Sequence, residues 1–146
     1  MEKIETILVP VDFGANAARV AGHGIDFARQ TGAKIYLLYV AESLERFVGF
    51  PVPHVSFGEL QKDVTAAAVR KMEEFAETHV PREVLLGSRV VSGEPAEEIV
   101  RVARELAVDM ICIGTHGYQG LERTIFGSVA EQVVKTAPCP VMTVRP

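Results

Sequence analysis

The segment that decides the fold is Ile4–Val11, which reads Ile-Glu-Thr-Ile-Leu-Val-Pro-Val and leads directly into Asp12-Phe13-Gly14. A short apolar run that ends at turn-forming residues is typical of a strand buried on both faces. Apolar residues at helical spacing follow over residues 16–31, with Asn16 as a candidate N-cap and Gly32 as a stop signal. The chain is therefore predicted to begin with a buried strand and an amphipathic helix.

The same alternation continues along the rest of the chain. Strands are predicted at Ile35–Val40, Val84–Val91, Met110–Ile113 and Val141–Val144, and helices at Ser56–His79, from Glu94-Pro95 onward, and at Ser128–Thr136. The stretch before the second helix, to about Val55, has no clear period and is expected to be a loop. Strands that alternate with helices form βαβ units, whose crossovers are right-handed and whose sheet is parallel. We expect one α/β domain over residues 1–146, a doubly wound five-stranded parallel sheet with helices on both faces.

The composition is that of a globular protein. Hydrophobic residues make up 48% and charged residues 23% of the 146 residues, which excludes a disordered chain. The net charge of -4 and the absence of a basic run argue against a nucleic-acid partner. No secretory signal or membrane-spanning run is visible, so we expect a cytoplasmic protein without a membrane partner.

The two cysteines show no metal or redox pattern. Cys112 lies in an apolar run and Cys139 lies between two prolines, without CxxC spacing. We interpret both as structural thiols in a reducing compartment, since a redox role would need an exposed thiol of low pKa.

The predicted topology points to a ligand site at one edge of the sheet. In doubly wound sheets, ligands bind beyond the carboxyl ends of the strands, where the winding direction reverses. If the strand order is 3-2-1-4-5, this point lies between the first and the fourth strand. The loops that begin at Asp12 and at Gly114 would then line the crevice.

The second of these loops, Gly114–Ser128, contains four glycines. Glycines let backbone amides approach an anion closely, and a helix that starts at Ser128 offers unpaired N–H groups and the positive end of its dipole. A phosphate chain is therefore a candidate ligand. A structural role is the alternative, because Ser128-Val129-Ala130-Glu131 has the sequence of a capping box. The loop is neither a P-loop nor a dinucleotide fingerprint, since GxxxxGK[ST] and GxGxxG are both absent.

The glycine spacing resembles that of a known family. Gly114-x2-Gly117, nine residues and then Gly127-Ser128 match the G-x2-G-x9-G-[ST] pattern of the ATP-binding universal stress proteins. The similarity also includes Ile7–Asp12 and Cys139–Val141 and so extends over the whole chain. The resemblance implies an adenine nucleotide alpha hydrolase-like fold that binds ATP, alone or together with Mg²⁺, and a homodimer formed through the edge strand Val141–Val144.

The resemblance also implies roles for individual residues. The adenine would be surrounded by Pro10, Val11, Asp12 and Val40, the ribose and first phosphates by Gly114 and Gly117, and the terminal phosphates by Gly127, Ser128 and Val129, with Thr115, His116 and Arg123 completing the site. Four of these residues keep alternatives: Asp12 as a helix cap or a metal ligand, Val40 as ordinary packing at a strand end, His116 as a packing residue, and Arg123 as a solvated loop residue.

Three functions remain open from the sequence. The leading hypothesis is a nucleotide-dependent regulator or adaptor of the stress response, in which bound ATP orders residues 115–126 for a partner. The second is a slow ATPase or phosphoryl-transfer enzyme at the same site, for which few groups beyond Asp12 are available. The third is a dimeric interaction protein that binds no nucleotide.

Overall fold

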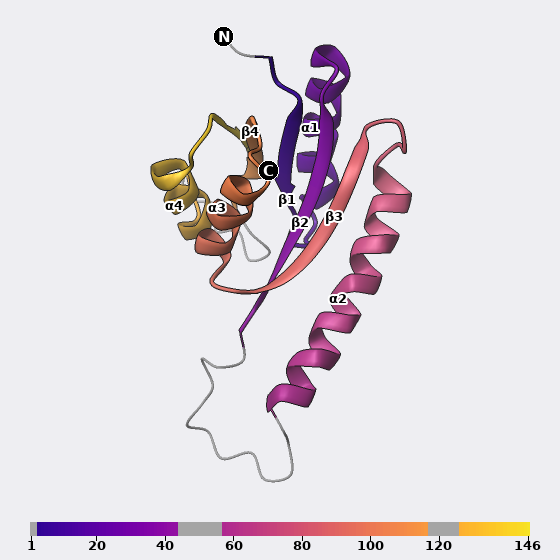
Figure 1. Cartoon of the computed structure of the whole chain (residues 1–146), viewed down its shortest axis with the longest axis vertical. Helices are drawn as coiled ribbons and strands as arrows, with labels where there is room; N and C mark the ends of the chain where they lie inside the picture. Colours follow the sequence, from indigo (N-terminus) through magenta and orange to yellow (C-terminus); the bar gives the residue numbers. More distant parts are fainter. Residues whose placement is uncertain (1–2, 44–56, 117–125) are drawn as a thin grey trace.

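The computed structural model describes residues 3–43, 57–116 and 126–146, in which strands and helices alternate (Figure 1). In chain order the elements are β1 (Thr6–Pro10), α1 (Ala17–Thr31), β2 (Lys34–Glu42), α2 (Phe57–His79), β3 (Leu85–Gly93), α3 (Pro95–Glu105), β4 (Met110–Gly114), α4 (Ser128–Thr136) and β5 (Val141–Val144). The predicted alternation is confirmed. The predicted loop before Val55, the predicted helix start at Ser56, and residues 117–125 of the glycine-rich loop lie outside the described residues.

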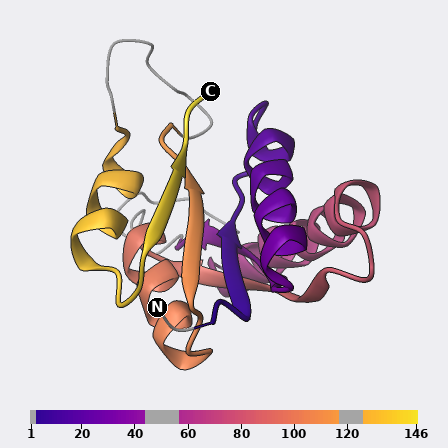
Figure 2. The same ribbon diagram turned by 90° about the horizontal axis from the view of Figure 1, so that it is seen from above.

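The five strands form one parallel sheet in the order β3-β2-β1-β4-β5, as predicted. The chain winds outward from β1 through β2 to β3 and then crosses to β4 and β5, so the winding direction reverses between β1 and β4. Helices cover both faces, and Figure 2 shows α1 and α4 on opposite sides of β4 and β5. The space beyond the carboxyl ends of β1 and β4 is therefore the expected place for a ligand.

Two apolar clusters bury the two faces of the sheet. Successive side chains of a strand point to opposite faces, so Val9 packs toward α1 and α2 while Leu8 packs toward α3 and α4. The fully buried strand residues are Ile7, Leu8, Val9, Ile35, Leu37, Leu38, Ile111 and Cys112. Burial on both faces explains why the three inner strands, β1, β2 and β4, have nearly uninterrupted apolar sequences.

The N-caps of the helices differ from the sequence predictions in one respect. α3 begins as expected, with Pro95 in its first turn and Glu97 and Glu98 near its positive end. The predicted capping box at 128–131 is wrong, because Gly127 is the N-cap of α4 and Ser128 is already helical. Asn16 occupies the N-cap position of α1, as predicted, but its side chain makes no capping hydrogen bond.

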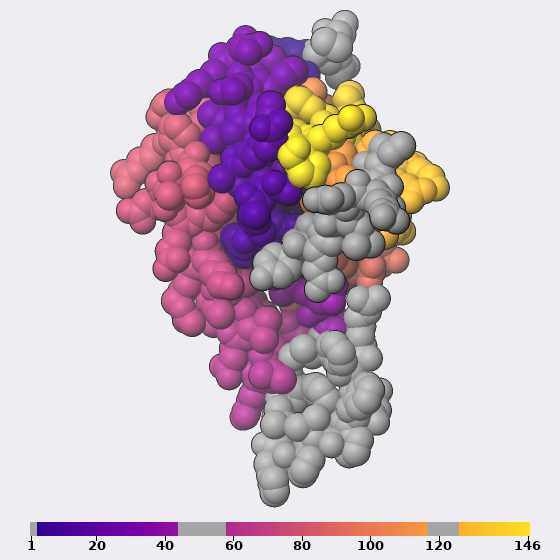
Figure 3. All heavy atoms as spheres, turned by 180° about the vertical axis from the view of Figure 1, so that it is seen from behind, coloured from indigo at the N-terminus to yellow at the C-terminus, as the bar shows by residue number. Residues whose placement is uncertain are grey.

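Side-chain contacts fix the two central strands and the chain end. The Asp109 carboxylate accepts the N–H groups of Glu5 and Thr6 at 2.9 and 3.0 Å, which ties the start of β1 to the start of β4. The Arg19 side chain donates from Nε to the Arg145 carbonyl at 3.0 Å. The C-terminal segment accordingly lies against α1 on the face shown in Figure 3.

Candidate functional site

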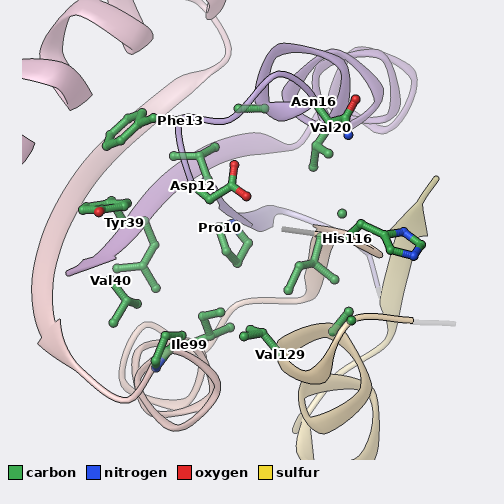
Figure 4. A pocket seen from close by; sticks show the side chains of 18 of the residues that line it. Pro10, Asp12, Phe13, Asn16, Val20, Tyr39, Val40, Ile99, His116 and Val129 are labelled. Carbon is green, nitrogen blue, oxygen red and sulfur yellow. The ribbon is translucent and has the colours of Figure 1, made fainter. Parts of the chain in front are cut away.

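A pocket of about 880 Å³ opens at the carboxyl edge of the sheet, where the winding reverses (Figure 4). Its walls come from the ends of β1, β2 and β4 and from the starts of α1, α3 and α4. Ten of the twelve residues predicted from the sequence line it, namely Pro10, Val11, Asp12, Val40, Gly114, Thr115, His116, Gly127, Ser128 and Val129. The other two, Gly117 and Arg123, lie outside the described residues. Folding thus brings the described members of the predicted site together around one space.

The backbone of Val40 faces this pocket because β2 extends past the end of β1. Pro10 is the last β1 residue that pairs with β2, opposite Leu38, and the Val11 N–H then donates to the Leu38 carbonyl at 2.8 Å. Backbone groups of successive strand residues point to alternate sides, so Val40 directs its N–H and C=O to the same side as Leu38. Among the described residues, no strand pairs with Val40 on that side. A donor and an acceptor therefore lie next to each other on the pocket wall.

The side chain of Asp12 is partly buried at the end of β1, and Figure 4 shows its carboxylate directed into the pocket. Its Oδ1 accepts the Gly14 N–H at 2.8 Å, which forms an Asx turn. The alternative of Asp12 as the cap of α1 is wrong, since α1 begins at Ala17, after Asn16. Within residues 3–43, 57–116 and 126–146, no three His, Cys, Asp or Glu side chains form a group that could hold a metal ion.

The opposite wall of the pocket is the first turn of α4. Thr115 is buried, with 2% of its surface exposed, and its N–H donates to the Val144 carbonyl at 2.9 Å. Its carbonyl accepts the Gly127 N–H at 2.5 Å, which holds the start of α4 against the end of β4. Among the residues that the structure describes, no side chain caps α4, so the first-turn amides of Ser128, Val129 and Ala130 are available to an anion in the pocket.

The ring of His116 takes part in a local contact. Its Nδ1 lies 2.9 Å from the hydroxyl of Thr115, and Figure 4 shows the ring directed away from the centre of the pocket. This geometry favours the interpretation of His116 as a loop residue that packs locally, with its backbone forming part of the wall.

Sequence reasoning missed Phe13, Tyr39 and Lys71, which also line the pocket. The ring centroids of Phe13 and Tyr39 lie 4.6 Å apart, and burial raises the pKa of the Tyr39 hydroxyl, as do the charges of Glu42 and Asp12. Lys71 reaches the pocket from α2 and is the one Lys or Arg among the described lining residues. Nothing in the sequence around Lys71 indicates that this residue belongs to a binding site. Phe13 follows Asp12 directly and could have been included by its place in the turn.

The fold and the site define a class of protein: a doubly wound parallel α/β protein with a ligand pocket at its switch point. No described helix is both long enough and apolar enough to cross a membrane. The family model described as "Universal stress protein family" matches residues 3–145. The chain belongs to the universal stress protein family.

Individual relatives agree with this assignment. Universal stress protein MJ0531 of Methanocaldococcus jannaschii is 36% identical over 141 residues, which cover 95% of this chain and 81% of the relative. The solved structure of MJ0577, from the same organism, is 30% identical, with a TM-score of 0.82 and coverage of 99% and 98%. A universal stress protein from Archaeoglobus fulgidus, solved in complex with dAMP, has the same fold, with 23% identity, a TM-score of 0.56 and coverage of 97% and 98%.

Proposed function

We propose that this universal stress protein binds an adenine nucleotide, with ATP as the principal ligand, in the pocket beyond the carboxyl ends of β1 and β4. The observation that carries the proposal is that one pocket contains both an open strand edge and an uncapped helix N-terminus. The first matches the hydrogen-bonding edge of a base, and the second matches a phosphate group. A nucleotide has both features at its two ends.

The base end of the proposed site is the backbone of Val40. Adenine presents an amino donor beside a ring-nitrogen acceptor, and these match the adjacent carbonyl and N–H of Val40. The lining of the pocket also includes apolar residues, among them Pro10, Val11, Ile99 and Ile113. A flat apolar ring that carries a donor and an acceptor on one edge fits such a wall.

The phosphate end is the first turn of α4, from Gly127 to Ala130. The described lining residues include one cationic side chain, that of Lys71, and two carboxylates, those of Asp12 and Glu42. These side chains therefore offset little of the negative charge of a triphosphate. Backbone amides and the helix dipole would provide most of the recognition. We include Mg²⁺ as an optional companion, because this ion binds through one or two carboxylates together with phosphates, and Asp12 is a fitting carboxylate.

The proposed activity is that of a nucleotide-dependent regulator or adaptor in the cytoplasm. Bound nucleotide would contact β1, β2, β4 and α4 at once and would join the two halves of the sheet across the switch point. A partner protein would recognise the occupied form. The dAMP complex of the Archaeoglobus protein supports an adenine nucleotide as the ligand class for this fold.

We further propose a homodimer through β5. This strand pairs with β4 on one side and is the edge of the sheet on the other. An open edge strand can pair with its own copy in a symmetric dimer, and nucleotide pockets of both protomers would then belong to one assembly.

Two measurements test the proposed function. Mass spectrometry of the small molecules that copurify with the protein is expected to show an adenine nucleotide in near-stoichiometric amount. Isothermal titration of the nucleotide-free protein with ATP is expected to show one site per chain. Protein that is folded, free of nucleotide and yet takes up no ATP, ADP or AMP would contradict the proposal.

A further inference from the structure

Phe13 has an unusual backbone conformation for its residue type. Its φ is +60°, in the left-handed region that bulky side chains rarely adopt. The residue lies immediately after Asp12 and lines the pocket. Backbone strain of this kind persists only where surrounding contacts hold it, and it is frequent at ligand sites.

The contacts that hold Phe13 come from two other elements. Its ring lies 4.6 Å from the ring of Tyr39 on β2 and 6.1 Å from the ring of Phe75 on α2, centroid to centroid. The ring belongs to the apolar cluster between the sheet and the two helices α1 and α2. Figure 4 shows Phe13 and Tyr39 together on one side of the pocket, beside Asp12.

The left-handed residue determines where the Asp12 carboxylate lies. Asp12 Oδ1 accepts the N–H of Gly14, and Phe13 is the residue enclosed by this hydrogen bond. The turn closes only with a suitable backbone conformation at its central residue. With Oδ1 engaged in the turn, Oδ2 is the carboxylate oxygen left to meet a hydrogen-bond donor in the pocket.

We propose that Phe13 is a positioning residue for ligand binding: its left-handed backbone, held by Tyr39 and Phe75, presents Oδ2 of Asp12 to a hydroxyl or amino group of the ligand. This inference rests on the proposed function, because its ligand is the adenine nucleotide. Phe13 thus acts on the ligand through Asp12. Its own ring packs against Tyr39 and Phe75 and makes no part of the proposed hydrogen bond.

A purely structural role for Phe13 makes the opposite prediction for a matched pair of variants. Asn adopts the left-handed conformation readily but is polar, whereas Val is apolar but is excluded from this conformation by its branched Cβ. If backbone conformation matters, Phe13→Asn binds ATP about tenfold more tightly than Phe13→Val. If only apolar packing matters, Phe13→Val binds at least as tightly as Phe13→Asn.

The experiment is isothermal titration of each variant with ATP, with urea unfolding to confirm that the proteins are folded. Phe13→Gly and Phe13→Ala form a second pair, which replaces the first if Phe13→Val does not fold, and the glycine variant is expected to bind more tightly. In an Asp12→Ala background the difference within each pair is expected to disappear, because the group being positioned is absent.

The outcomes separate this inference from the proposed function. Wild-type protein that binds ATP, with Phe13→Val equal to or tighter than Phe13→Asn, overturns the positioning role alone. A difference that persists in the Asp12→Ala background also overturns it. Wild-type protein that binds no adenine nucleotide contradicts the proposed function, and the positioning role for this ligand with it.

Discussion

The backbone N–H of Gly127 donates a hydrogen bond to the carbonyl oxygen of Thr115 across 2.5 Å, which joins the start of α4 to the end of β4. Gly127 has φ -71° and ψ 164°, an extended conformation that any residue adopts. The fold therefore does not require glycine here for its backbone freedom. What glycine does provide is an N-cap without a side chain, at the wall where we place the phosphates.

The variant Gly127→Ser tests whether an N-cap without a side chain serves phosphate binding. The serine hydroxyl is expected to accept an N–H from the first turn of α4, which raises the free energy of unfolding by about 0.4 kcal/mol. The same hydrogen bond takes an amide away from the phosphate, and the added side chain occupies the approach to it. We therefore expect the affinity for ATP to fall about tenfold while stability rises.

Gly127→Ala is the matched control for this experiment. Its methyl group takes up space in the pocket but offers no acceptor, and Ala is a poor N-cap, so stability is expected to fall slightly. Urea unfolding and isothermal titration measure the two quantities separately. Unchanged ATP affinity in both variants would show that phosphates do not lie at Gly127.

Replacing the base of the ligand tests the role of Val40, since its backbone groups cannot be removed by mutation. Inosine triphosphate carries a carbonyl in place of the amino group of adenine and an N–H in place of the ring acceptor. The inosine carbonyl then faces the Val40 carbonyl, and the inosine N–H faces the Val40 N–H. We therefore expect binding at least about tenfold weaker than that of ATP. The monophosphates AMP and IMP should show the same ratio, because the difference lies at the base. Equal affinities for the two bases would refute recognition by this strand edge.

The proposed dimer is tested by Thr143→Pro. The carbonyls of Pro140 and Val144 accept N–H groups from the side of β4, so alternation directs the Thr143 N–H toward the open edge. Proline at position 143 removes that donor and leaves the pairing with β4 in place. We expect sedimentation velocity to show dimers for wild type and for the control Thr143→Ala, and monomers for Thr143→Pro. A wild type that is monomeric at micromolar concentration would remove the dimer from the proposal.

Stability at alkaline pH is expected to depend on Cys112. Burial raises the pKa of the Cys112 thiol to about 12, whereas an unfolded cysteine titrates near 8.5. Between these values the folded state retains the proton that the unfolded state has lost. The contribution is thus complete below pH ~8.5, and the free energy of unfolding then falls by about 1.4 kcal/mol per pH unit as pH rises toward 12.

Urea unfolding of wild type and Cys112→Ala at several pH values between neutrality and pH ~10.5 measures this slope. The alanine variant is expected to be less stable at neutral pH, because it leaves a small cavity in the core, and to lose less stability as pH rises. The raised pKa of Tyr39 acts in the same direction, so Tyr39→Phe serves to separate its share. An alkaline slope that is the same with and without Cys112 would be evidence against the buried, protonated thiol.

Much of the fold was predictable because its determinants are local or general. A parallel sheet that is buried on both faces needs short apolar strands such as Ile7–Val9 and Ile111–Ile113, and these are visible as runs in the sequence. The predicted capping box failed for the opposite reason. Ser128 and Glu131 have the required spacing, but the N-cap is Gly127, whose N–H donates to the Thr115 carbonyl at the end of β4, a contact that the spacing does not reveal.

The sequence by itself determined the order of the elements, the parallel sheet and the two loops that meet at its switch point, since apolar periodicity and the handedness of crossovers suffice for these. Only the tertiary structure decided which backbone and side-chain groups line the pocket. The overhang of β2 that exposes Val40 depends on where β1 ends, the approach of Lys71 depends on the packing of α2, and the left-handed Phe13 depends on rings from β2 and α2. Each of these features arises from contacts between residues far apart in the chain, which no local pattern records.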